Sequence, residues 1–302
     1  MIRFQDVRKT FGATRAVDGV TLTIGPGEVV ALLGPNGSGK TTTLKMAAGL
    51  VKPDAGRVTI GEPPVDAGDP RARRALSFLP QRVAFPEALT GREVVDFYRR
   101  LRALNPDRAT AVLRFASLNG AGERPVATYS GGMVQRLGLA VAMLPDAETL
   151  LLDEPTAALD PQGLQAFYSL VCERRSPRQS VLFTSHQVAD VERLADRIVI
   201  MAAGRLAGEY TRDALRTWRD AHGVMRVRLD GDPGRILSAV QRLAPRAAVE
   251  GGEVIVPGGA AERAAVLDAI RESGGVITGL VAEDGRLDAL YAELVGSGGT
   301  HA

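Results

Sequence analysis

The hydrophobic positions of the first two-thirds of the chain fall into short apolar runs and longer stretches with helical spacing. The candidates for strands buried on both faces are Val29–Leu33, Thr149–Leu152 and Ser180–Thr184. Apolar residues recur at helical spacing over residues 92–104, 132–144 and 163–175. Partly alternating strands are expected at Ile2–Val7, Val20–Ile24 and Val58–Ile60. Buried strands that alternate with helices predict an α/β fold with a mainly parallel central sheet.

The pattern changes after residue 217. Short predicted strands at 224–229, 254–256 and 276–281 alternate with predicted helices at 234–243, 260–272 and 286–294. This is typical of a small α+β module, and the order of its elements favours a ferredoxin-like arrangement. We therefore expect two domains, residues 1–217 and residues 218–302.

Composition excludes several classes of protein. Of 302 residues, 45% are hydrophobic and 24% charged, which excludes a disordered or fibrous chain. A net charge of +2 excludes a dedicated nucleic-acid binder, so no nucleic-acid partner is expected. The longest stretch without a charged residue, Pro161 to Cys172, is too short for a membrane-spanning helix, which needs about 20 residues. No signal peptide is expected, and the single cysteine, Cys172, indicates the reducing cytosol without a cysteine-built zinc site.

A glycine-rich loop between the first buried strand and the next helix matches the pattern G-x-x-x-x-G-K-[ST]. Its residues are Gly34, Pro35, Asn36, Gly37, Ser38, Gly39, Lys40 and Thr41. Glycines let backbone N–H groups turn toward phosphate oxygens, and the helix N-terminus adds its positive dipole end. Lys40 suits the β- and γ-phosphates, and the Thr41 hydroxyl suits Mg²⁺. The alternative, a glycine-rich turn with an incidental lysine, does not explain the flanking strand and helix. By itself the loop predicts a nucleoside triphosphate and does not separate kinases, GTPases and ATPases.

Two carboxylates, Asp153 and Glu154, follow the buried run Thr149–Leu152. At the carboxyl end of a parallel strand beside the loop, Asp153 can hold Mg²⁺ through water and Glu154 can polarise an attacking water. The alternative is a strand that ends in acidic loop residues. The sequence Pro-Thr-Ala-Ala-Leu-Asp that follows directly weakens this alternative.

Ser130, Gly131 and Gly132 open the helical stretch at 132–144. Ser130 fits a plain helix N-cap. Its hydroxyl and the helix-terminal N–H groups equally fit a second anion site, aimed at a γ-phosphate. Because the chain already has one phosphate loop, a second phosphate-binding element is expected to serve the nucleotide of another chain.

With these motifs in place, residues 2–215 resemble the ATP-binding subunit of an ABC transporter. The matching motifs are Walker A with Lys40, the Q-loop Gln81, the signature Tyr129–Met133, Walker B with Asp153 and Glu154, the D-loop Ala158–Asp160, and the switch histidine His186. The signature has Tyr in place of the usual first Leu and Met in place of the final Gln. The resemblance implies a P-loop ABC cassette: a mainly parallel central sheet, an antiparallel β subdomain and an α-helical subdomain.

The resemblance also implies which residues bind ATP and Mg²⁺. Nucleotide contacts are expected from Phe11, Val17, Gly34, Pro35, Asn36, Gly37, Ser38, Gly39, Lys40, Thr41, Thr42, Ser130, Gly131, Gly132 and Asp160. The metal is expected at Thr41, Gln81 and Asp153. Catalytic roles are expected for Glu154, His186 and Gln81.

Phe11 is expected to stack on the adenine, with Val17 as its packing neighbour. Taken singly, Phe11 also fits core filler, Gln81 a loop amide and His186 a structural hydrogen-bonding residue. Their joint order with the other motifs favours the functional roles.

Two cassettes are expected to bind two ATP head to tail in a homodimer, in which Glu154 polarises the water and His186 senses the γ-phosphate.

Because no membrane-spanning segment is expected, the resemblance implies a separate integral membrane permease. The chain is then cytoplasmic and peripheral, held on the inner face of the membrane through that permease. A permease helix is expected to dock near residues 77–81 and 82–90. Phe85, Phe97 and Tyr98 are candidate contacts, although Phe97 and Tyr98 equally fit helix core.

The cargo is open at this point. The signature Met, the short cassette and the terminal segment Asp288–Leu294 are similar to subunits of export-type transporters with six-helix permeases. Residues 76–101 and Gly61–Pro64 are similar to ATP-binding subunits of the copper-processing system that matures nitrous-oxide reductase. A multidrug- or antibiotic-export cassette is the alternative.

A soluble ABC-type ATPase acting on ribosomes or DNA fits less well, because such members usually carry two cassettes or long insertions. The signature argues against a non-ABC kinase or GTPase. The C-terminal module fits regulation, partner docking or stabilisation of the dimer.

Overall fold

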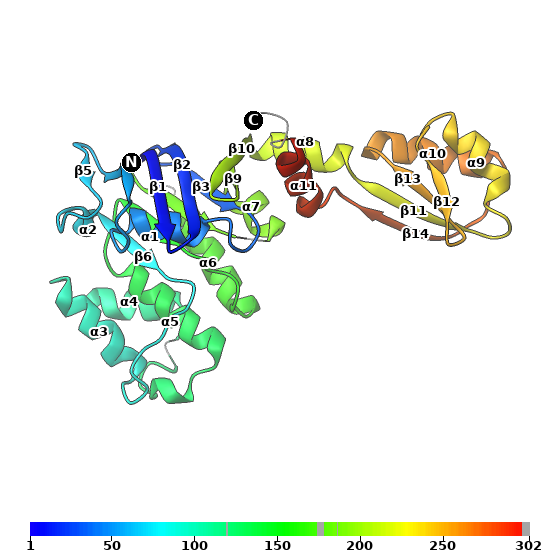
Figure 1. The fold of residues 1–302 in the computed structure, drawn as a ribbon. Helices are drawn as coiled ribbons and strands as arrows, with labels where there is room; N and C mark the ends of the chain where they lie inside the picture. The colour runs from blue at the N-terminus through cyan, green and yellow to red at the C-terminus, as the bar shows by residue number, and fades with distance from the viewer. Residues whose placement is uncertain (119, 174–177, 186, 298–302) are drawn as a thin grey trace. The chain divides into compact units, whose positions relative to one another are not determined.

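The computed structural model describes the chain except residues 119, 174–177, 186 and 298–302 (Figure 1). The chain forms two compact units, Met1–Tyr210 and Thr211–Ala302. The expected domain boundary after residue 217 falls within α8 (Arg212–Ala221), the first helix of the second unit.

A six-stranded sheet lies at the centre of the first unit. Its strand order is β10 (Arg205–Thr211), β9 (Arg197–Ala202), β3 (Val29–Leu33), β8 (Ser180–Thr184), β7 (Thr149–Leu152) and β6 (Leu76–Leu79). The five strands from β9 to β6 run parallel. Every residue of β3, β7 and β8 is buried, which explains their uninterrupted apolar sequence. The predicted parallel sheet is confirmed, and these three strands have their predicted bounds.

An antiparallel sheet packs its inner face into the same core. Its strand order is β2 (Thr14–Ile24), β1 (Ile2–Phe11), β4 (Ala55–Ile60) and β5 (Val65–Asp66). Ile2 pairs with both Ile24 and Ile60, and all three are buried. β1 and β2 are longer than the predicted strands. The prediction missed their outer parts because residues 8–11 and 14–16 are exposed or half-buried and show no apolar alternation.

Helices connect the strands and form a separate helical subdomain. The connecting helices are α1 (Lys40–Ala47), α2 (Ala72–Ala75), α6 (Pro161–Glu173) and α7 (Val188–Leu194). The helical subdomain contains α3 (Gly91–Leu101), α4 (Asp107–Phe115), the short 3-10 helix η1 (Val126–Thr128) and α5 (Gly131–Met143), which share a hydrophobic core (Figure 1). The expected antiparallel β and α-helical subdomains are confirmed. No helix among the described residues is long and apolar enough to cross a membrane.

The start of α3 is fixed by its own sequence. Thr90 Oγ1 accepts a hydrogen bond from the Glu93 backbone N–H at 3.2 Å, and the Glu93 carboxylate accepts one from the Thr90 N–H at 2.8 Å. This reciprocal capping box satisfies two N–H groups that the helix itself leaves without partners. It therefore sets the position of the helical subdomain's first helix.

The second unit contains a four-stranded antiparallel sheet and four helices. Its elements after α8 are β11 (Val224–Leu229), α9 (Gly234–Gln241), β12 (Ala248–Glu250), β13 (Glu253–Pro257), α10 (Ala260–Glu272), β14 (Ile277–Glu283) and α11 (Leu287–Ser297). The strand order is β12-β13-β11-β14. This is the split βαβ topology of ferredoxin-like folds, so the expected α+β module is confirmed.

Candidate functional site

The glycine-rich loop runs from the end of β3 to the start of α1 and packs very closely against its neighbours. Gly34 has a φ of +152° and Gly39 a φ of +103°, which are backbone conformations that residues with a Cβ rarely adopt. A Cβ at Gly34 would lie 2.3 Å from the carbonyl oxygen of Met201, and one at Gly39 would lie 2.3 Å from that of Ala16. These two positions therefore require glycine, and the loop is held against β9 and β2.

Lys40 begins α1, and its side chain folds back into the loop. Its Nζ donates to the carbonyl oxygens of Gly34 at 2.7 Å and Pro35 at 3.1 Å. Burial lowers the pKa of the ammonium, and the nearby Glu154 and Asp153 carboxylates oppose this shift. An ammonium has three N–H donors, so the loop fixes the charge and leaves one donor for an incoming acceptor.

Asp153 follows β7 and is only 1% exposed. Its Oδ1 accepts hydrogen bonds from Thr41 Oγ1 at 3.1 Å and Thr184 Oγ1 at 2.8 Å. Its Oδ2 is buried without a hydrogen-bond partner within the part of the chain that the structure describes. Burial raises the pKa of the carboxyl, and the two hydroxyl donors oppose this shift. A buried oxygen of this kind is costly unless a ligand completes its contacts.

The expected metal residues offer only oxygen ligands. These are the hydroxyl of Thr41, the side-chain amide oxygen of Gln81 and the carboxylate of Asp153, including its unpartnered Oδ2. Mg²⁺ takes oxygen ligands, usually one or two from protein carboxylates with the rest from phosphates and water. The residues therefore fit Mg²⁺.

Glu154 adopts an unusual backbone conformation, with a φ of +46°. Its N–H donates to Thr184 Oγ1 at 2.7 Å, and the same hydroxyl donates to Asp153. Gln81 Nε2 donates to Glu154 Oε2 at 2.9 Å. Backbone strain at a non-glycine residue is held only where surrounding contacts over-determine it, and such residues cluster at functional sites. Thr184 supplies one of those contacts, although no sequence pattern had singled it out.

One cavity of about 420 Å³ joins these elements. It is lined by Thr14, Ala16, Asn36, Gly37, Ser38, Gly39, Lys40, Thr41, Thr42, Gln81 and Glu154. The structure therefore brings the expected residues 36–42 together with Gln81 and Glu154, whereas Gly34 and Pro35 do not line the cavity. Its other walls come from residues of β2 that the sequence analysis did not assign.

The two residues expected to contact adenine lie in different environments. Phe11 is 50% exposed at the end of β1, with Lys9 Nζ 5.3 Å from its ring centroid, so it is not core filler. Val17, in contrast, has no exposed surface and belongs to the main core. The expected role of Val17 as the packing neighbour of Phe11 stays a prediction. The residues of β2 that line the cavity are Thr14 and Ala16.

The signature residues do not line this cavity. Ser130 caps α5 by accepting a hydrogen bond from the Met133 N–H at 3.2 Å. Gly131 and Gly132 occupy the first turn of that helix, and a Cβ at Gly132 would lie 3.3 Å from the carbonyl oxygen of Ala158. Ser130 is an N-cap, and this role leaves its own O–H free to donate.

Asp160 joins the signature helix to α6. Its Oδ1 accepts from the Gly163 N–H at 2.8 Å, and its Oδ2 lies 3.4 Å from Arg136 Nη2. The same guanidinium donates to the carbonyl oxygens of Ala116 and Ser117 at 3.3 and 3.2 Å. Nothing in the sequence pattern distinguished the buried Arg136 from a surface arginine. His186, expected near the γ-phosphate, lies outside the described residues.

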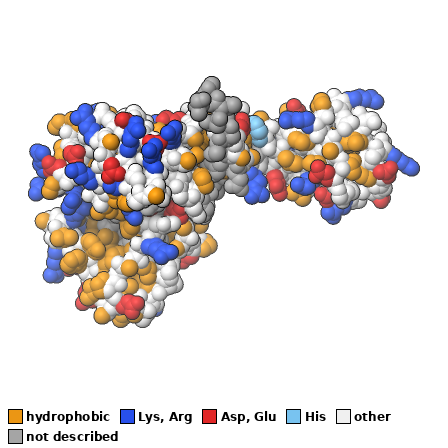
Figure 2. Space-filling model, viewed as in Figure 1, with side chains coloured by type: hydrophobic (Ala, Val, Ile, Leu, Met, Phe, Trp, Pro, Cys, Tyr) orange, Lys and Arg blue, Asp and Glu red, His pale blue; other side chains and the backbone are white. Residues whose placement is uncertain are grey.

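Hydrophobic side chains gather over the helical subdomain (Figure 2), where Phe97 is 58% and Leu101 70% exposed. Phe97 is therefore not helix core, whereas Tyr98 is half-buried between Phe97 and Phe85, with ring centroids 5.3 and 6.2 Å away. Phe97 and Leu101 line one hollow on this surface.

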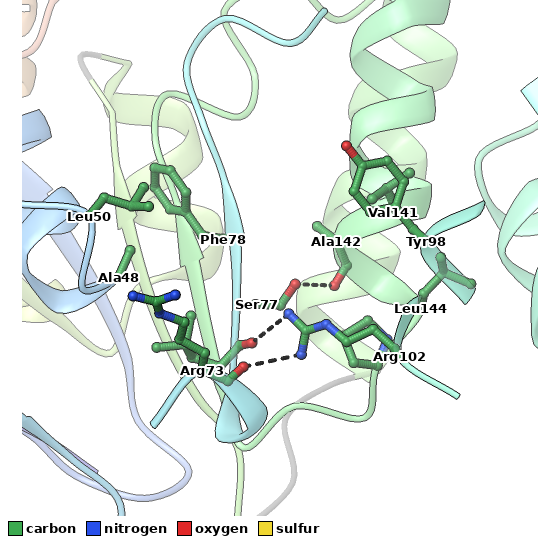
Figure 3. Close-up of a pocket in the computed structure, with 12 residues that line it drawn as sticks. Ala48, Leu50, Arg73, Ser77, Phe78, Tyr98, Arg102, Val141, Ala142 and Leu144 are labelled. Carbon is green, nitrogen blue, oxygen red and sulfur yellow. Dashed lines mark hydrogen bonds between the residues drawn. The ribbon is translucent and has the colours of Figure 1, made fainter. Parts of the chain in front are cut away.

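A groove of about 210 Å³ lies beside this surface (Figure 3). Leu50 and Phe78 face it from one side and Tyr98 from the other (Figure 3). Arg102 donates to the carbonyl oxygens of Arg73 and Leu76 at 3.1 and 3.5 Å. The groove includes two residues of the expected docking segment 77–81, Ser77 and Phe78.

A buried lysine in a glycine-rich loop and strand-end carboxylates at one edge of a parallel sheet define a P-loop nucleotide-binding cassette. Comparison with known proteins gives the family. Residues 17–157 match the family described as ABC transporter. The chain is 30% identical over 248 residues to the linearmycin resistance ATP-binding protein of Bacillus subtilis, covering 81% of this chain and 80% of that protein. The chain therefore belongs to the ABC transporter family, as an ATP-binding subunit and ATPase.

Other relatives agree. A Nod factor export ATP-binding protein of Burkholderia lata is 37% identical, with 71% of this chain and 72% of that protein covered. A daunorubicin resistance ATP-binding protein of Streptomyces coeruleorubidus is 36% identical, with 71% and 69% covered. The solved ATP-binding subunit of an ABC transporter superimposes with a TM-score of 0.66 at 28% identity, covering 72% of this chain and 92% of that one. A dimeric cassette in a post-hydrolysis state bound to ADP and Pi gives 0.65 at 26% identity, covering 70% and 99%. The predicted fold and family resemblance are confirmed.

We predict that Asp153→Asn raises the melting temperature of the nucleotide-free protein at pH 7.5 by about 2–4 °C, the change that roughly 1 kcal/mol makes in a domain of this size. Burial raises the folded-state pKa of this carboxyl, so its ionised form destabilises the fold at neutral pH, and this cost disappears as the pH falls through the folded pKa. A thermal-shift series from pH 7.5 to pH 4.5 should show the gain shrinking.

Asp18→Asn is the matched control with the opposite sign. Hydrogen bonds from Arg205 and Arg15 lower the pKa of Asp18, so its ionised form stabilises the fold at neutral pH and loses that effect in acid. Its substitution should lower the melting temperature at pH 7.5. Melting-temperature shifts of the same sign in the two variants, or a loss in Asp153→Asn with a gain in Asp18→Asn, would contradict the assigned electrostatics.

Proposed function

We propose that the chain hydrolyses Mg²⁺-bound ATP as a homodimer and thereby energises a separate, export-type membrane permease. One observation carries the proposal: Lys40, Gln81 and Glu154, from three distant segments, line a single cavity. Thr41 and Asp153 are hydrogen-bonded to each other beside it. A phosphate-binding cation, oxygen ligands and a carboxylate poised for a water are therefore adjacent, as phosphoryl transfer to water requires.

In this proposal each residue has one task. The loop N–H groups and Lys40 hold the β- and γ-phosphates. Thr41, Gln81 and Asp153 would hold Mg²⁺, which, when bound, neutralises charge on the phosphate oxygens. Glu154 accepts a proton from the attacking water, and Gln81 Nε2, 2.9 Å from Glu154 Oε2, orients that carboxylate. The task of stabilising the γ-phosphate falls to His186 by resemblance to the family.

Each nucleotide would be completed by the second copy of the chain. Ser130, Gly131 and Gly132 do not line the chain's own cavity, and they combine a hydroxyl with helix-terminal N–H groups. A head-to-tail dimer would bring them to the partner's γ-phosphate. ATP then favours the closed dimer and ADP releases it, because only the γ-phosphate contacts both chains. Two solved structures of one related cassette are dimeric, which supports this arrangement.

The groove of Figure 3 is the proposed docking site for a permease helix. Leu50 is 62% exposed at its rim, and Phe78 and Tyr98 line it, so an apolar helix face would find matching surface. Through this contact the chain would lie on the cytoplasmic face of the membrane. Residues 1–217 would act as the nucleotide-binding domain, and residues 218–302 as a regulatory or partner-docking module.

The direction of transport is proposed from the relatives. Three of them are named for linearmycin resistance, daunorubicin resistance or Nod factor export, which supports an export cassette. Drug or antibiotic export is therefore favoured over the copper-processing system, for which the sequence segments at 61–64 and 76–101 are the support.

Glu154→Gln should lower ATP turnover by at least about 10²-fold while trapping an ATP-bound dimer, because the amide keeps the shape of the side chain but cannot accept the proton. Size-exclusion chromatography with and without ATP measures the dimer.

Lys40→Ala should abolish both ATP binding and turnover, because the loop loses its cation. A preference for GTP, together with no ATP-dependent dimer of the Glu154→Gln variant, would overturn the proposal.

Leu50→Asp should abolish co-purification with the proposed permease, while ATP turnover of the isolated chain stays within about twofold, because an exposed site tolerates the change. Leu50→Met, which keeps an apolar side chain at the same exposed position, is the matched control and should co-purify normally. Equal recovery of both variants would contradict the assignment of the groove.

A further inference from the structure

A second polar cluster, separate from the lining of the nucleotide cavity, surrounds Asp190 in the first turn of α7. Asp190 has no exposed surface. Its Oδ2 accepts hydrogen bonds from Thr156 Oγ1 at 2.6 Å and Ser185 Oγ at 3.1 Å, and its Oδ1 accepts one from Tyr168 Oη at 2.7 Å. All three donors are neutral hydroxyl groups from three different segments.

Such a cluster is not an efficient way to stabilise a core. A buried carboxylate loses its hydration, and three neutral hydroxyl donors restore only part of that loss. Burial and the Asp190 carboxylate together raise the pKa of Tyr168 to about 12, so this donor stays protonated at neutral pH. A fully satisfied buried network does, however, fix one arrangement of the segments that it joins.

The segments joined here carry the hydrolytic residues. Thr156 lies two residues after Glu154, in the loop that follows β7. Ser185 directly precedes His186 in the chain, and its Oγ also accepts from the Gln187 N–H at 2.9 Å. One carboxylate oxygen therefore ties the loop after β7 to the loop after β8.

This tie complements the one made by Thr184. The Thr184 hydroxyl joins the end of β8 to the backbone N–H of Glu154 and to Asp153, on the side of the metal ligands. Asp190 joins the same two strand ends one step further along each loop. The strained Glu154, with its φ of +46°, lies between the two ties.

We propose that Asp190 is a positioning residue for ATP hydrolysis: through Thr156 and Ser185 it holds the loop after β7, which contains Glu154, and the end of β8 in one fixed arrangement. The inference rests on the roles proposed above for Glu154 and His186. Asp190 does not line the cavity, so it acts on turnover and not on nucleotide affinity.

The test compares kcat with ATP affinity in the full chain. Asp190→Asn, Thr156→Val and Ser185→Ala each remove part of the network. Asp190→Asn should lower kcat on the order of 10²-fold, the cost of a misplacement of about 1 Å, and the other two by about tenfold. The dissociation constant for ATP should stay within about threefold, because the loop that holds the phosphates is untouched.

Two matched controls remove the same chemical groups at the opposite ends of the same strands. Thr149→Val changes a fully buried threonine at the start of β7. Ser180→Ala removes a hydroxyl that donates to the Gly25 carbonyl oxygen at 2.7 Å, at the start of β8. Both should keep kcat within about twofold, although Ser180→Ala loses a hydrogen bond.

A structural role alone would give a different result. Parallel losses of kcat, ATP affinity and melting temperature, equal kcat losses in the controls, or an unchanged kcat in Asp190→Asn would each overturn the proposal. If Asp190→Asn does not fold, the kcat and the ATP dissociation constant of Thr156→Val and Ser185→Ala test the proposal in its place.

Hydrogen–deuterium exchange separates this inference from the proposed function. Thr156→Val should speed exchange in peptides covering both residues 152–158 and 183–188, whereas Thr149→Val should not. If the wild-type chain failed to hydrolyse ATP, the proposed function would fall, and the exchange pattern would still decide whether the two loops are tied. Faster exchange in the first peptide alone would overturn the tie.

Discussion

The parallel pairing of β3, β8, β7 and β6 is the constraint on which the site depends. Leu32 pairs with Thr184, and Leu152 pairs with both Phe183 and Leu79. The carboxyl ends of these strands therefore meet at one edge of the sheet, where the loops that follow them carry the chemistry. Because side chains alternate along a strand, a register slip of one residue would turn each of them to the opposite face. The site is thus as precise as the pairing of four short, fully or largely buried strands.

The same edge concentrates polar groups that the nucleotide-free chain satisfies only in part. Lys40 is held by two carbonyl oxygens, and Asp153 by two hydroxyl groups with one oxygen left over. Each is a charge removed from water with less compensation than an ion pair would give. Proteins accept such local costs where a ligand supplies the missing contacts. The buried apolar strands around the site offset this cost, because their packing fixes the positions of Lys40 and Asp153.

The features that the sequence predicted are those that leave a strong one-dimensional signal. β3, β7 and β8 were predicted at their observed bounds because burial on both faces excludes polar residues. α4 was missed because only Ala109, Val112 and Leu113 of its residues are buried, too narrow a stripe to stand out. β9 was missed as well, although its central four residues are buried.

In the candidate site, motif spacing predicted the loop residues and Glu154, which lie just after strand ends, whereas Gln81 was predicted through the family resemblance. Thr184, Arg136 and Asp190 act through contacts between segments far apart in the chain, and their residue types are common on surfaces. No single-sequence pattern marks such contacts. Val17 was expected beside Phe11 from its place in the motif order, and the structure shows that its side chain lies in the core.

The contact between Arg136 and Asp160 has a consequence for how two ATP sites would influence each other. Through this guanidinium, the start of the signature helix, the end of α4 at Ala116 and Ser117, and the loop before α6 are joined into one body. In a head-to-tail dimer the signature end of that body would face the partner's nucleotide, while α6 continues toward the chain's own Tyr168 and Asp190. In the proposed dimer, any effect of a ligand at one site on affinity at the other would be matched by an equal effect in the reverse direction.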